Sequence, residues 1–225
     1  MNPSAQMKYQ LEADGIMLDF GARRILADVY MKCETGKITG LLGRNGQGKS
    51  CLMNIIYGTL PALSKSVRFN GRPIYEAFKR PDLITYLPQF HFIPGFLTLQ
   101  RVFTDFALDY AAFCAHFPEF KQPVHTRISE LSGGQRRLIE VYVVLMSPSH
   151  FSMLDEPFSQ LMPLYIERLQ VLLKEEKERK GFLISDHLFQ QVTDIADQVY
   201  VLSNGKTHLI KELSDLERLQ YAKRY

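Results

Sequence analysis

The octapeptide Gly43–Ser50, GRNGQGKS, constrains this chain more than any other stretch. It matches G-x-x-x-x-G-K-[ST], in which a glycine-rich turn lets several backbone N–H groups point at one phosphate. Lys49 would add a positive charge for the β- and γ-phosphates, and Ser50 would supply a hydroxyl ligand for Mg²⁺. A chance Gly-Lys-Ser in a βα turn is the alternative. The strand pattern before the loop and the helix pattern after it argue against chance and predict a nucleoside triphosphate site.

The predicted nucleotide ligands continue through the whole loop and one position beyond it. They are Gly43, Arg44, Asn45, Gly46, Gln47, Gly48, Lys49, Ser50 and Cys51.

Strand and helix patterns alternate along most of the chain, which favours a mostly parallel sheet covered by helices. Residues 9–42 have the pattern of β-structure, whereas residues 97–120 have apolar residues at helical spacing, with Thr98 as the expected N-cap. Residues 163–181 predict an amphipathic helix ended by Gly181.

We therefore expect one α/β domain over residues 1–225, with the fold of a P-loop NTPase. A catalytic core with an N-terminal antiparallel β-subdomain would occupy about 1–89 and 145–225. A small inserted helical subdomain would occupy about 90–144.

Composition narrows the setting in which the chain works. A net charge of +3 in 225 residues is too mild to indicate direct nucleic-acid binding. Three widely spaced cysteines and the lack of a signal-like N-terminus predict a reducing compartment, hence the cytoplasm. The strongest apolar run, LIEVYVVLM, is interrupted by Glu140, so we expect a buried helix there and no membrane span.

A second candidate feature is the acidic end of an apolar strand, FSMLDE, at residues 151–156. In P-loop enzymes such a strand delivers an aspartate that holds Mg²⁺ at the carboxyl edge of the sheet. Asp155 is the predicted metal ligand, and Glu156 is then free to orient and deprotonate a water. A strand that ends in a solvated turn is the alternative, and the phosphate loop disfavours it.

A second glycine-rich loop, LSGGQ at residues 131–135, precedes another run of helix formers, for which we expect a helix from near Gln135 to about Met146. Such a loop presents backbone N–H groups to an anion. This loop has no lysine of the kind found in the phosphate loop, and its purpose is not explained by the motifs above.

The order GRNGQGKS, YLPQ, LSGGQ, MLDEP and ISDH resembles the ATP-binding cassette (ABC) ATPases. The resemblance implies that two chains, a homodimer or this chain with a related cassette, lie head to tail around two Mg²⁺-bound ATP molecules. The second loop would then hold the γ-phosphate bound by the partner. Its implied ligands are Ser132, Gly133, Gly134 and Gln135.

The resemblance also assigns roles to three residues outside these loops. Gln89 matches the glutamine that contacts Mg²⁺ or the attacking water, and His187 matches the histidine that contacts the γ-phosphate. Phe20 matches an aromatic residue that stacks on adenine, although it could equally be a core residue. The implied catalytic residues are thus Glu156, His187, Gln89 and Lys49, and the implied metal ligands are Ser50, Gln89 and Asp155.

The sequence departs from the family after the acidic strand end. The family usually has Ser-Ala-Leu-Asp there, whereas this chain places Gln160 and Met162 at the positions of the alanine and the aspartate. Cys51 replaces a hydroxyl residue that is frequent after the phosphate loop. The changes at residues 160 and 162 put in doubt how closely hydrolysis is coordinated between two sites, and the change at Cys51 removes one phosphate contact.

The resemblance finally implies a cellular role. We expect the ATP-hydrolysing subunit of a multi-subunit ABC transporter, peripheral on the cytoplasmic face of a membrane. It would dock a transmembrane permease subunit through the helical insert and the segment that contains Gln89. The stretch FHFIPGF at residues 90–96 fits such docking, but it fits the core of the insert as well. The alternative function is a soluble ABC ATPase with an assembly, scaffold or nucleotide-sensing role.

Overall fold

The computed structural model describes residues 8–210 and residue 215. Among these residues one sheet is antiparallel and has the strand order β2-β1-β4-β5. Its strands are β1 (Gln10–Phe20), β2 (Arg23–Glu34), β4 (Ser64–Phe69) and β5 (Arg72–Pro73). Buried Leu11, Ala13, Ile16 and Leu18 mark the face of β1 that turns inward, as expected for a sheet with one solvated face.

The second sheet is mostly parallel, with the order β10-β9-β3-β8-β7-β6. Only the edge pair β9–β10 is antiparallel within it. Every residue of the central strands β3, β7 and β8 is buried, because helices or the other sheet cover both faces. Its strands are β3 (Ile38–Leu42), β6 (Ile84–Leu87), β7 (Phe151–Asp155), β8 (Gly181–Ser185), β9 (Gln198–Ser203) and β10 (Lys206–Ile210). The predicted α/β fold, with its mostly parallel sheet and its N-terminal antiparallel sheet, is confirmed.

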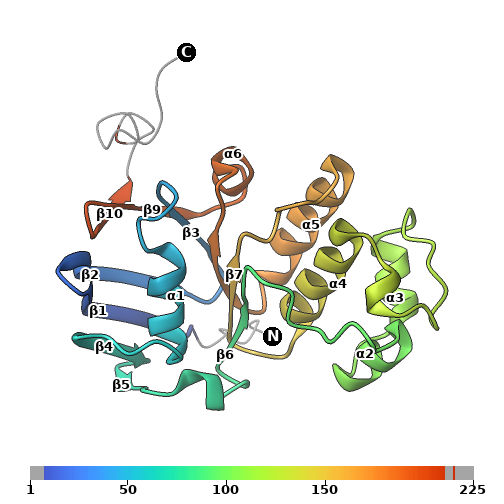
Figure 1. Ribbon diagram of the computed structural model, residues 1–225, viewed down its shortest axis with the longest axis horizontal. Helices are drawn as coiled ribbons and strands as arrows, with labels where there is room; N and C mark the ends of the chain where they lie inside the picture. The colour runs from blue at the N-terminus through green and yellow to red at the C-terminus, as the bar shows by residue number, and fades with distance from the viewer. Residues whose placement is uncertain (1–7, 211–214, 216–225) are drawn as a thin grey trace, which may run out of the picture.

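Helix α1 (Lys49–Tyr57) lies between the two sheets (Figure 1). Its apolar residues Leu52, Met53 and Ile56 share a buried cluster with residues of both sheets. This packing fixes the N-terminus of α1, and with it the phosphate loop, against the carboxyl end of β3.

The other helices lie on the far side of the mixed sheet (Figure 1). They are α2 (Leu99–Asp105), α3 (Tyr110–His116), α4 (Gly133–Met146), α5 (Pro163–Glu176) and α6 (Phe189–Thr193). Of the short 3₁₀ turns, Ile128–Glu130 precedes α4, and Ala77–Lys79 packs against α1 on the other side of the sheet. None of the helices within the described residues combines the length and the apolar character needed to cross a lipid bilayer.

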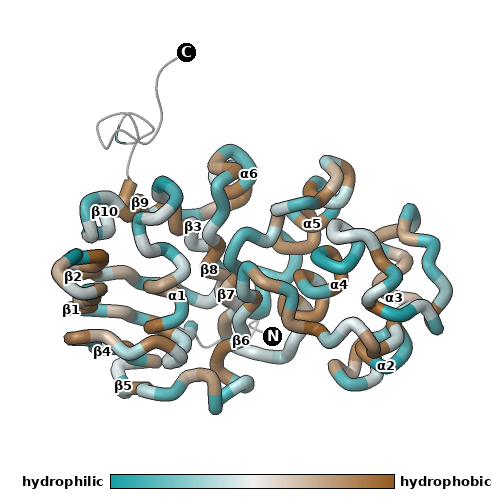
Figure 2. The backbone as a smooth tube through the Cα atoms, in the orientation of Figure 1, coloured by the Kyte–Doolittle hydropathy of each residue, from teal (hydrophilic) through white to brown (hydrophobic). Residues whose placement is uncertain are grey.

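An aromatic cluster attaches the α2–α3 insert to helix α4. Phe113 lies at the centre, with its ring centroid 5.3 Å from that of Phe103, 5.1 Å from Phe117 and 4.9 Å from Tyr142 of α4. In Figure 2 apolar segments of the insert lie against α4, on the side away from the β-strands. Thr98 is the N-cap of α2, as predicted, and its hydroxyl accepts a hydrogen bond from the Arg101 N–H at 3.3 Å.

Two predicted helix boundaries were wrong. Helix α5 ends at Glu176, not at Gly181, which is the first residue of β8. A Cβ at Gly181 would lie 2.4 Å from a ring carbon of Phe151, so this glycine serves a close approach between strands and not a helix cap. Helix α4 begins at Gly133, two residues before the expected start near Gln135, since Ser132 is its N-cap.

Candidate nucleotide site

The phosphate loop joins the end of β3 to the first residue of α1. Gly48, the N-cap of α1, has φ 101°, and a Cβ there would lie 2.8 Å from Ile25 Cγ2, so only glycine fits. No side chain caps this helix, which leaves its first N–H groups available to an anion.

Lys49 is buried and folds back over its own loop. Its Nζ donates hydrogen bonds to the carbonyl oxygens of Gly43 at 2.7 Å and of Arg44 at 3.3 Å. Burial lowers the pKa of Lys49, and the nearby carboxylates of Glu156, Asp155 and Asp186 oppose that shift. The cation is thus held beside the loop by groups that an arriving phosphate could replace.

A cavity of about 570 Å³ opens beside this loop. Its lining combines residues of the β1–β2 hairpin, the phosphate loop and the acidic strand end: Phe20, Arg23, Ile25, Asn45, Gly46, Gly48, Lys49, Ser50, Cys51, Gln89 and Glu156. All of them except Arg23 and Ile25 were predicted from the sequence. The other predicted loop residues, Gly43, Arg44 and Gln47, belong to the same turn but do not line the cavity.

Arg23 and Ile25 enter the cavity because of the hairpin. Phe20 pairs with Arg23 across the short turn of β1 and β2, so residues that follow the aromatic position reach the same wall. The glycine at residue 21 marks that turn and is the sequence signal that could have identified them. Phe20 is 54% exposed, which disfavours the alternative of a core residue.

Asp155, at the end of β7, is only 1% exposed. Burial raises its pKa, and the hydroxyl of Ser50 opposes the rise. Within the described residues Asp155 Oδ1 is buried, yet no donor meets hydrogen-bond geometry with it. A buried carboxylate oxygen without a partner is unfavourable unless a cation or water completes it.

This arrangement fits Mg²⁺. The carboxylate of Asp155 and the hydroxyl of Ser50 are hard oxygen donors, the type that Mg²⁺ prefers. No group of three or more His, Cys, Asp or Glu side chains in the described ranges could hold a metal by itself. Mg²⁺ commonly relies on one or two protein ligands together with substrate phosphates, so a site beside the phosphate loop suits it.

Glu156 has an unusual backbone conformation for a residue with a side chain, with φ 53°. Its N–H donates to the Ser185 carbonyl of β8 at 2.6 Å, and the Ser159 hydroxyl donates to its Oε2 at 3.3 Å. Such a conformation costs on the order of 1–3 kcal/mol and persists where the surroundings impose it. The result is a carboxylate that lines the cavity next to the buried Asp155.

His187 follows β8 and lies beside Glu156. Its Nδ1 is 3.3 Å from Asp186 Oδ1 and 3.8 Å from Glu156 Oε2. Asp186 is buried, which raises its pKa, and it accepts hydrogen bonds from the N–H groups of Phe158 and Leu188. The two predicted residues Glu156 and His187 are therefore brought together, with Asp186 as a fixed support.

The LSGGQ loop forms the N-terminus of α4 and has its own local hydrogen bonds. The Ser132 hydroxyl accepts from the Gln135 N–H at 3.3 Å, and Gln135 Oε1 accepts from the Ser132 N–H at 3.1 Å. This is a capping box, a pattern that S-x-x-Q announces in the sequence and that our sequence interpretation missed. Ser132 is exposed, and residues 132–135 do not line the cavity.

The two glycines of this loop pack against Gln160. A Cβ at Gly134 would lie 2.5 Å from the Gln160 carbonyl oxygen, and a Cβ at Gly133 would lie 2.7 Å from Gln160 Oε1. Gln160 itself has φ 64°. The segment that departs from the family pattern thus supports the LSGGQ loop of its own chain.

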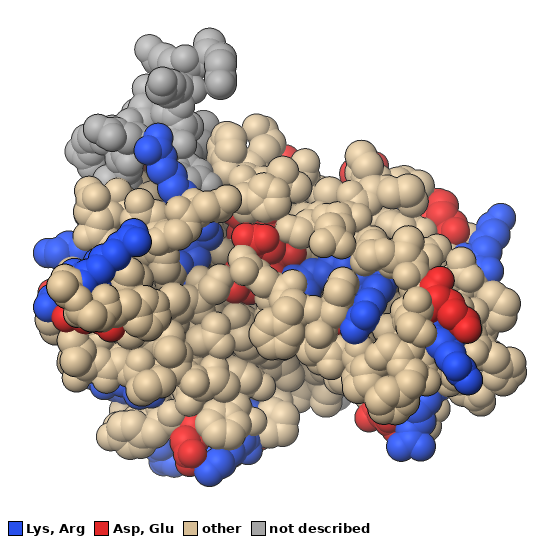
Figure 3. All heavy atoms as spheres, in the orientation of Figure 1, with Lys and Arg blue, Asp and Glu red and all other residues tan. Residues whose placement is uncertain are grey.

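Charge on the face that carries these loops is mixed. Figure 3 shows acidic side chains gathered near the middle of the visible face, with basic side chains on both sides of them. This pattern differs from the continuous basic face expected of a nucleic-acid-binding domain.

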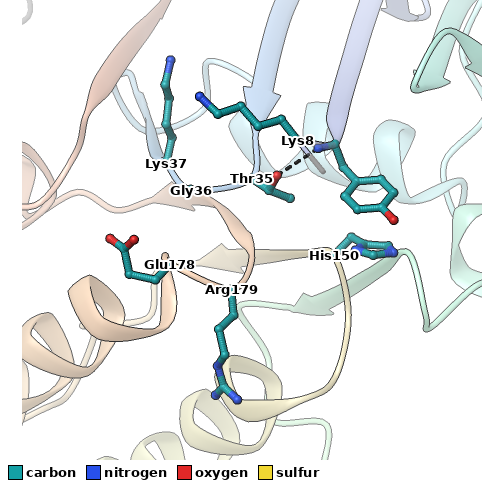
Figure 4. Close-up of a pocket in the computed structure, with 8 residues that line it drawn as sticks. Lys8, Thr35, Gly36, Lys37, His150, Glu178 and Arg179 are labelled. Carbon is teal, nitrogen blue, oxygen red and sulfur yellow. Dashed lines mark hydrogen bonds between the residues drawn. The ribbon is translucent and has the colours of Figure 1, made fainter. Parts of the chain in front are cut away.

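A second cavity, of about 460 Å³, lies at the amino ends of the parallel strands of the mixed sheet, near the residues that precede β3 and β7. Its cations do not converge. In Figure 4 the amino groups of Lys8 and Lys37 point one way and the guanidinium of Arg179 points the other, while the His150 ring stacks on Tyr9. The cavity beside the phosphate loop is therefore the better candidate for an anionic ligand.

Comparisons with known proteins agree with this geometry. A family model described as ABC transporter matches residues 26–159. The chain is 31% identical over 215 residues to a probable ABC transporter ATP-binding protein of Azorhizobium caulinodans, which covers 87% of this chain and 74% of that protein. It is 28% identical to the high-affinity branched-chain amino acid transport ATP-binding protein BraG of Pseudomonas aeruginosa, over 87% of this chain and 90% of that protein.

Among solved structures, one described as the ATP binding subunit of an ABC transporter superposes with a TM-score of 0.76. The match covers 92% of both chains at 24% identity, and at that identity it supports the fold alone.

Proposed function

This chain belongs to the ABC transporter ATP-binding family, whose members bind and hydrolyse ATP, and from that premise we propose how its own residues do so and what they drive. We propose that two copies, or one copy and a related cassette, close head to tail around two ATP molecules. Their closing and opening would move transmembrane partner subunits. The observation that carries the proposal is the separation, within one chain, of the nucleotide cavity from the exposed LSGGQ loop.

In the proposed binding mode Phe20 stacks on adenine, a contact worth about 1–3 kcal/mol for a base on an aromatic ring. The loop from Gly43 to Cys51 surrounds the phosphates, and Lys49 leaves its loop carbonyls to bind the β- and γ-phosphates. The exposure of Phe20 and its place on the cavity wall support this mode.

Mg²⁺ would be held by Ser50, Asp155 and Gln89, and when bound it would neutralise charge on the β- and γ-phosphates. The buried oxygen Asp155 Oδ1, which has no hydrogen-bond donor in the described residues, supports a cation at this position. Gln89 lines the same cavity and so lies within the same site.

For hydrolysis we assign Glu156 to orient the attacking water and to accept its proton. His187 would donate a hydrogen bond to the γ-phosphate, with Asp186 fixing the orientation of its ring. The 3.8 Å separation of His187 Nδ1 from Glu156 Oε2 and the imposed backbone of Glu156 support paired roles for these side chains.

The second copy would supply Ser132, Gly133, Gly134 and Gln135 to the same ATP. The Ser132 oxygen accepts a bond from its own helix, so its hydroxyl proton remains free to donate to a phosphate. A swing from 1% to 99% closed requires about 5.5 kcal/mol of differential binding. Hydrogen bonds to charged groups contribute about 1.5–3 kcal/mol each, so a few per dimer suffice. Loss of the γ-phosphate would remove most of this energy and let the copies separate.

The docking surface for a transmembrane permease subunit would lie beside Gln89. Phe90 and Phe96 are 71% and 76% exposed, whereas Ile93 between them is buried in the cluster that the insert shares with α4, α5 and the mixed sheet. Residues 90–96 therefore combine exposed aromatic side chains that are available to a partner with a residue that packs inside the protein. Exposed aromatic residues beside a nucleotide-contacting glutamine would let a partner sense the site.

Glu156→Gln tests the central proposal. The amide keeps the shape of the site but cannot accept the proton of water, so we expect ATP and Mg²⁺ to trap a stable dimer that gel filtration with light scattering detects. Glu167→Gln, which changes an exposed glutamate on α5, is the matched control and should hydrolyse ATP normally. Elution of Glu156→Gln only as a monomer with ATP and Mg²⁺ would contradict the proposal.

The transport role is tested separately. We expect the chain to co-purify with a membrane protein from solubilised membranes, and Phe90→Ser with Phe96→Ser to weaken that association while leaving ATP binding intact. A fully active ATPase that never associates with membranes would favour the alternative, a soluble ABC ATPase with an assembly, scaffold or sensing role.

A further inference from the structure

We propose that Tyr86 is a positioning residue for the metal carboxylate: its hydroxyl occupies one oxygen of Asp155 and so directs the other toward Mg²⁺. This inference rests on the proposed Mg²⁺ site. Tyr86 is the first residue of the YLPQ stretch, in which the resemblance assigns a role to Gln89 and none to Tyr86.

Tyr86 reaches Asp155 from the neighbouring strand. It lies on β6, which pairs in parallel with β7, and its hydroxyl is 3.2 Å from Asp155 Oδ2. Its ring is half-buried, with its centroid 5.2 Å from that of Tyr57 on α1. The ring is therefore held by packing, and the hydroxyl is presented to one carboxylate oxygen.

The direction of these hydrogen bonds is fixed by Asn54. Its Nδ2 donates to the Tyr86 oxygen at 3.3 Å and to the Ser50 carbonyl at 2.7 Å. Because an amide N–H can only donate, the Tyr86 oxygen accepts there and its own proton is left for Asp155.

The two oxygens of Asp155 thus differ. Oδ2 accepts a hydrogen bond from Tyr86, whereas no donor in the described part of the chain meets hydrogen-bond geometry with the buried Oδ1. Carboxylates that bind metals are commonly held by such outer partners, and removing the partner typically costs about 10–100-fold in metal affinity. Asn54 extends the connection to the Ser50 carbonyl, so Ser50 and Asp155, two of the three proposed protein ligands of Mg²⁺, are joined through one short chain of hydrogen bonds.

Tyr86→Phe tests this role because it removes only the hydroxyl. The matched control is Tyr57→Phe, which removes a hydroxyl from the adjacent ring, where the described residues show no hydrogen bond to Asp155. The probe is Mn²⁺, followed by electron paramagnetic resonance in the presence of a non-hydrolysable ATP analogue. Binding of the analogue in excess EDTA and the Tm of the metal-free protein are measured alongside.

For Tyr86→Phe we expect Mn²⁺ to bind about 10–100-fold more weakly, with unchanged analogue binding in EDTA. Tyr57→Phe should bind Mn²⁺ like the wild type. Unchanged Mn²⁺ affinity in Tyr86→Phe, or an equal loss in both variants, would overturn the role of Tyr86 alone. Absence of nucleotide-dependent Mn²⁺ binding in the wild type, or full binding in Asp155→Asn, would overturn the Mg²⁺ site and this inference together.

Discussion

The phosphate loop and the LSGGQ loop both place glycines at the start of a helix, but their N–H groups are used differently. Helix α1 begins at Gly48 with no side-chain cap, so its first N–H groups stay available. Helix α4 begins after Ser132 with a complete capping box, which already occupies the N–H groups of Ser132 and Gln135. The first loop can hold an anion without help, whereas the second has fewer donors to offer.

The glycines differ as well. Gly48 is required because its φ of 101° and the closeness of Ile25 exclude a side chain within the loop itself. Gly133 and Gly134 are required by Gln160, from the segment that follows the acidic strand end. Gly48 therefore needs to be glycine for its own backbone conformation as well as for the contact with Ile25 of β2, whereas Gly133 and Gly134 need to be glycine only for the contact with Gln160. A phosphate loop that is separated, within one chain, from the exposed LSGGQ loop is the arrangement expected if a second molecule brings its own LSGGQ loop to the bound nucleotide.

Lys49→Ala removes the cation of the phosphate loop and should have the largest effect of the variants in this section. The variant loses charge-assisted hydrogen bonds of about 1.5–3 kcal/mol each, so ATP should bind at least about 100-fold more weakly in a calorimetric titration. Lys37→Ala is the control. Lys37 is paired with Glu34 and lines the other cavity, at the amino ends of the strands, so this variant should bind ATP normally. Unchanged ATP affinity in Lys49→Ala would count against the assigned phosphate loop.

Ser132→Asp separates the two roles of Ser132, the N-cap of α4 and the proposed donor to the partner's ATP. Aspartate is as good an N-cap as serine, so the free energy of unfolding in urea should stay within about 0.5 kcal/mol of wild type. Its carboxylate has no proton to donate to a phosphate and repels it, so ATPase activity should fall by at least about 10–100-fold, as expected for the loss of one hydrogen bond to a charged group. Wild-type activity in this variant would restrict Ser132 to a capping role.

Gly134→Ala and Gly133→Ala probe the contact with Gln160. A Cβ at Gly134 meets a backbone oxygen, which cannot move alone, whereas a Cβ at Gly133 meets the end of a flexible side chain. We expect Gly134→Ala to lose about 1–3 kcal/mol of unfolding free energy and Gly133→Ala clearly less. Adding Gln160→Ala should rescue Gly133→Ala only. Equal losses in the two single variants would mean that Gln160 does not shape the loop.

The sequence could predict the parts of the site that local patterns mark. The phosphate loop, the acidic strand end and the strands that lead to them are local patterns, so Lys49, Asp155 and Glu156 could be placed in one site by motif and order. Contacts between distant segments have no local pattern: the packing of Gln160 on Gly134, the reach of Arg23 into the cavity and the bond from Tyr86 to Asp155 follow from strand pairing and layer packing.

The error at Gly181 has the same origin. A glycine after a helical pattern usually ends the helix, yet here the ring of Phe151 demands it and the helix ends earlier. Nothing close to residue 181 in the sequence announces that ring. In contrast, the capping box at Ser132 and Gln135 is a local S-x-x-Q pattern that the sequence itself contains.

Met162→Asp makes the finest test of how the two loops cooperate. Met162 is 54% exposed, two residues after the Gln160 that supports the LSGGQ loop, and it stands where the resemblance implies an aspartate at the interface between copies. Restoring a carboxylate would add at most a hydrogen bond or two of about 0.5–1.5 kcal/mol each, so we expect ATPase turnover to rise about two- to tenfold. Gel filtration of Glu156→Gln with and without the change would show whether the gain comes from a tighter dimer. No change in either measurement would mean that the apolar residue is neutral, and that coupling between copies depends on the LSGGQ loop and its support by Gln160 instead.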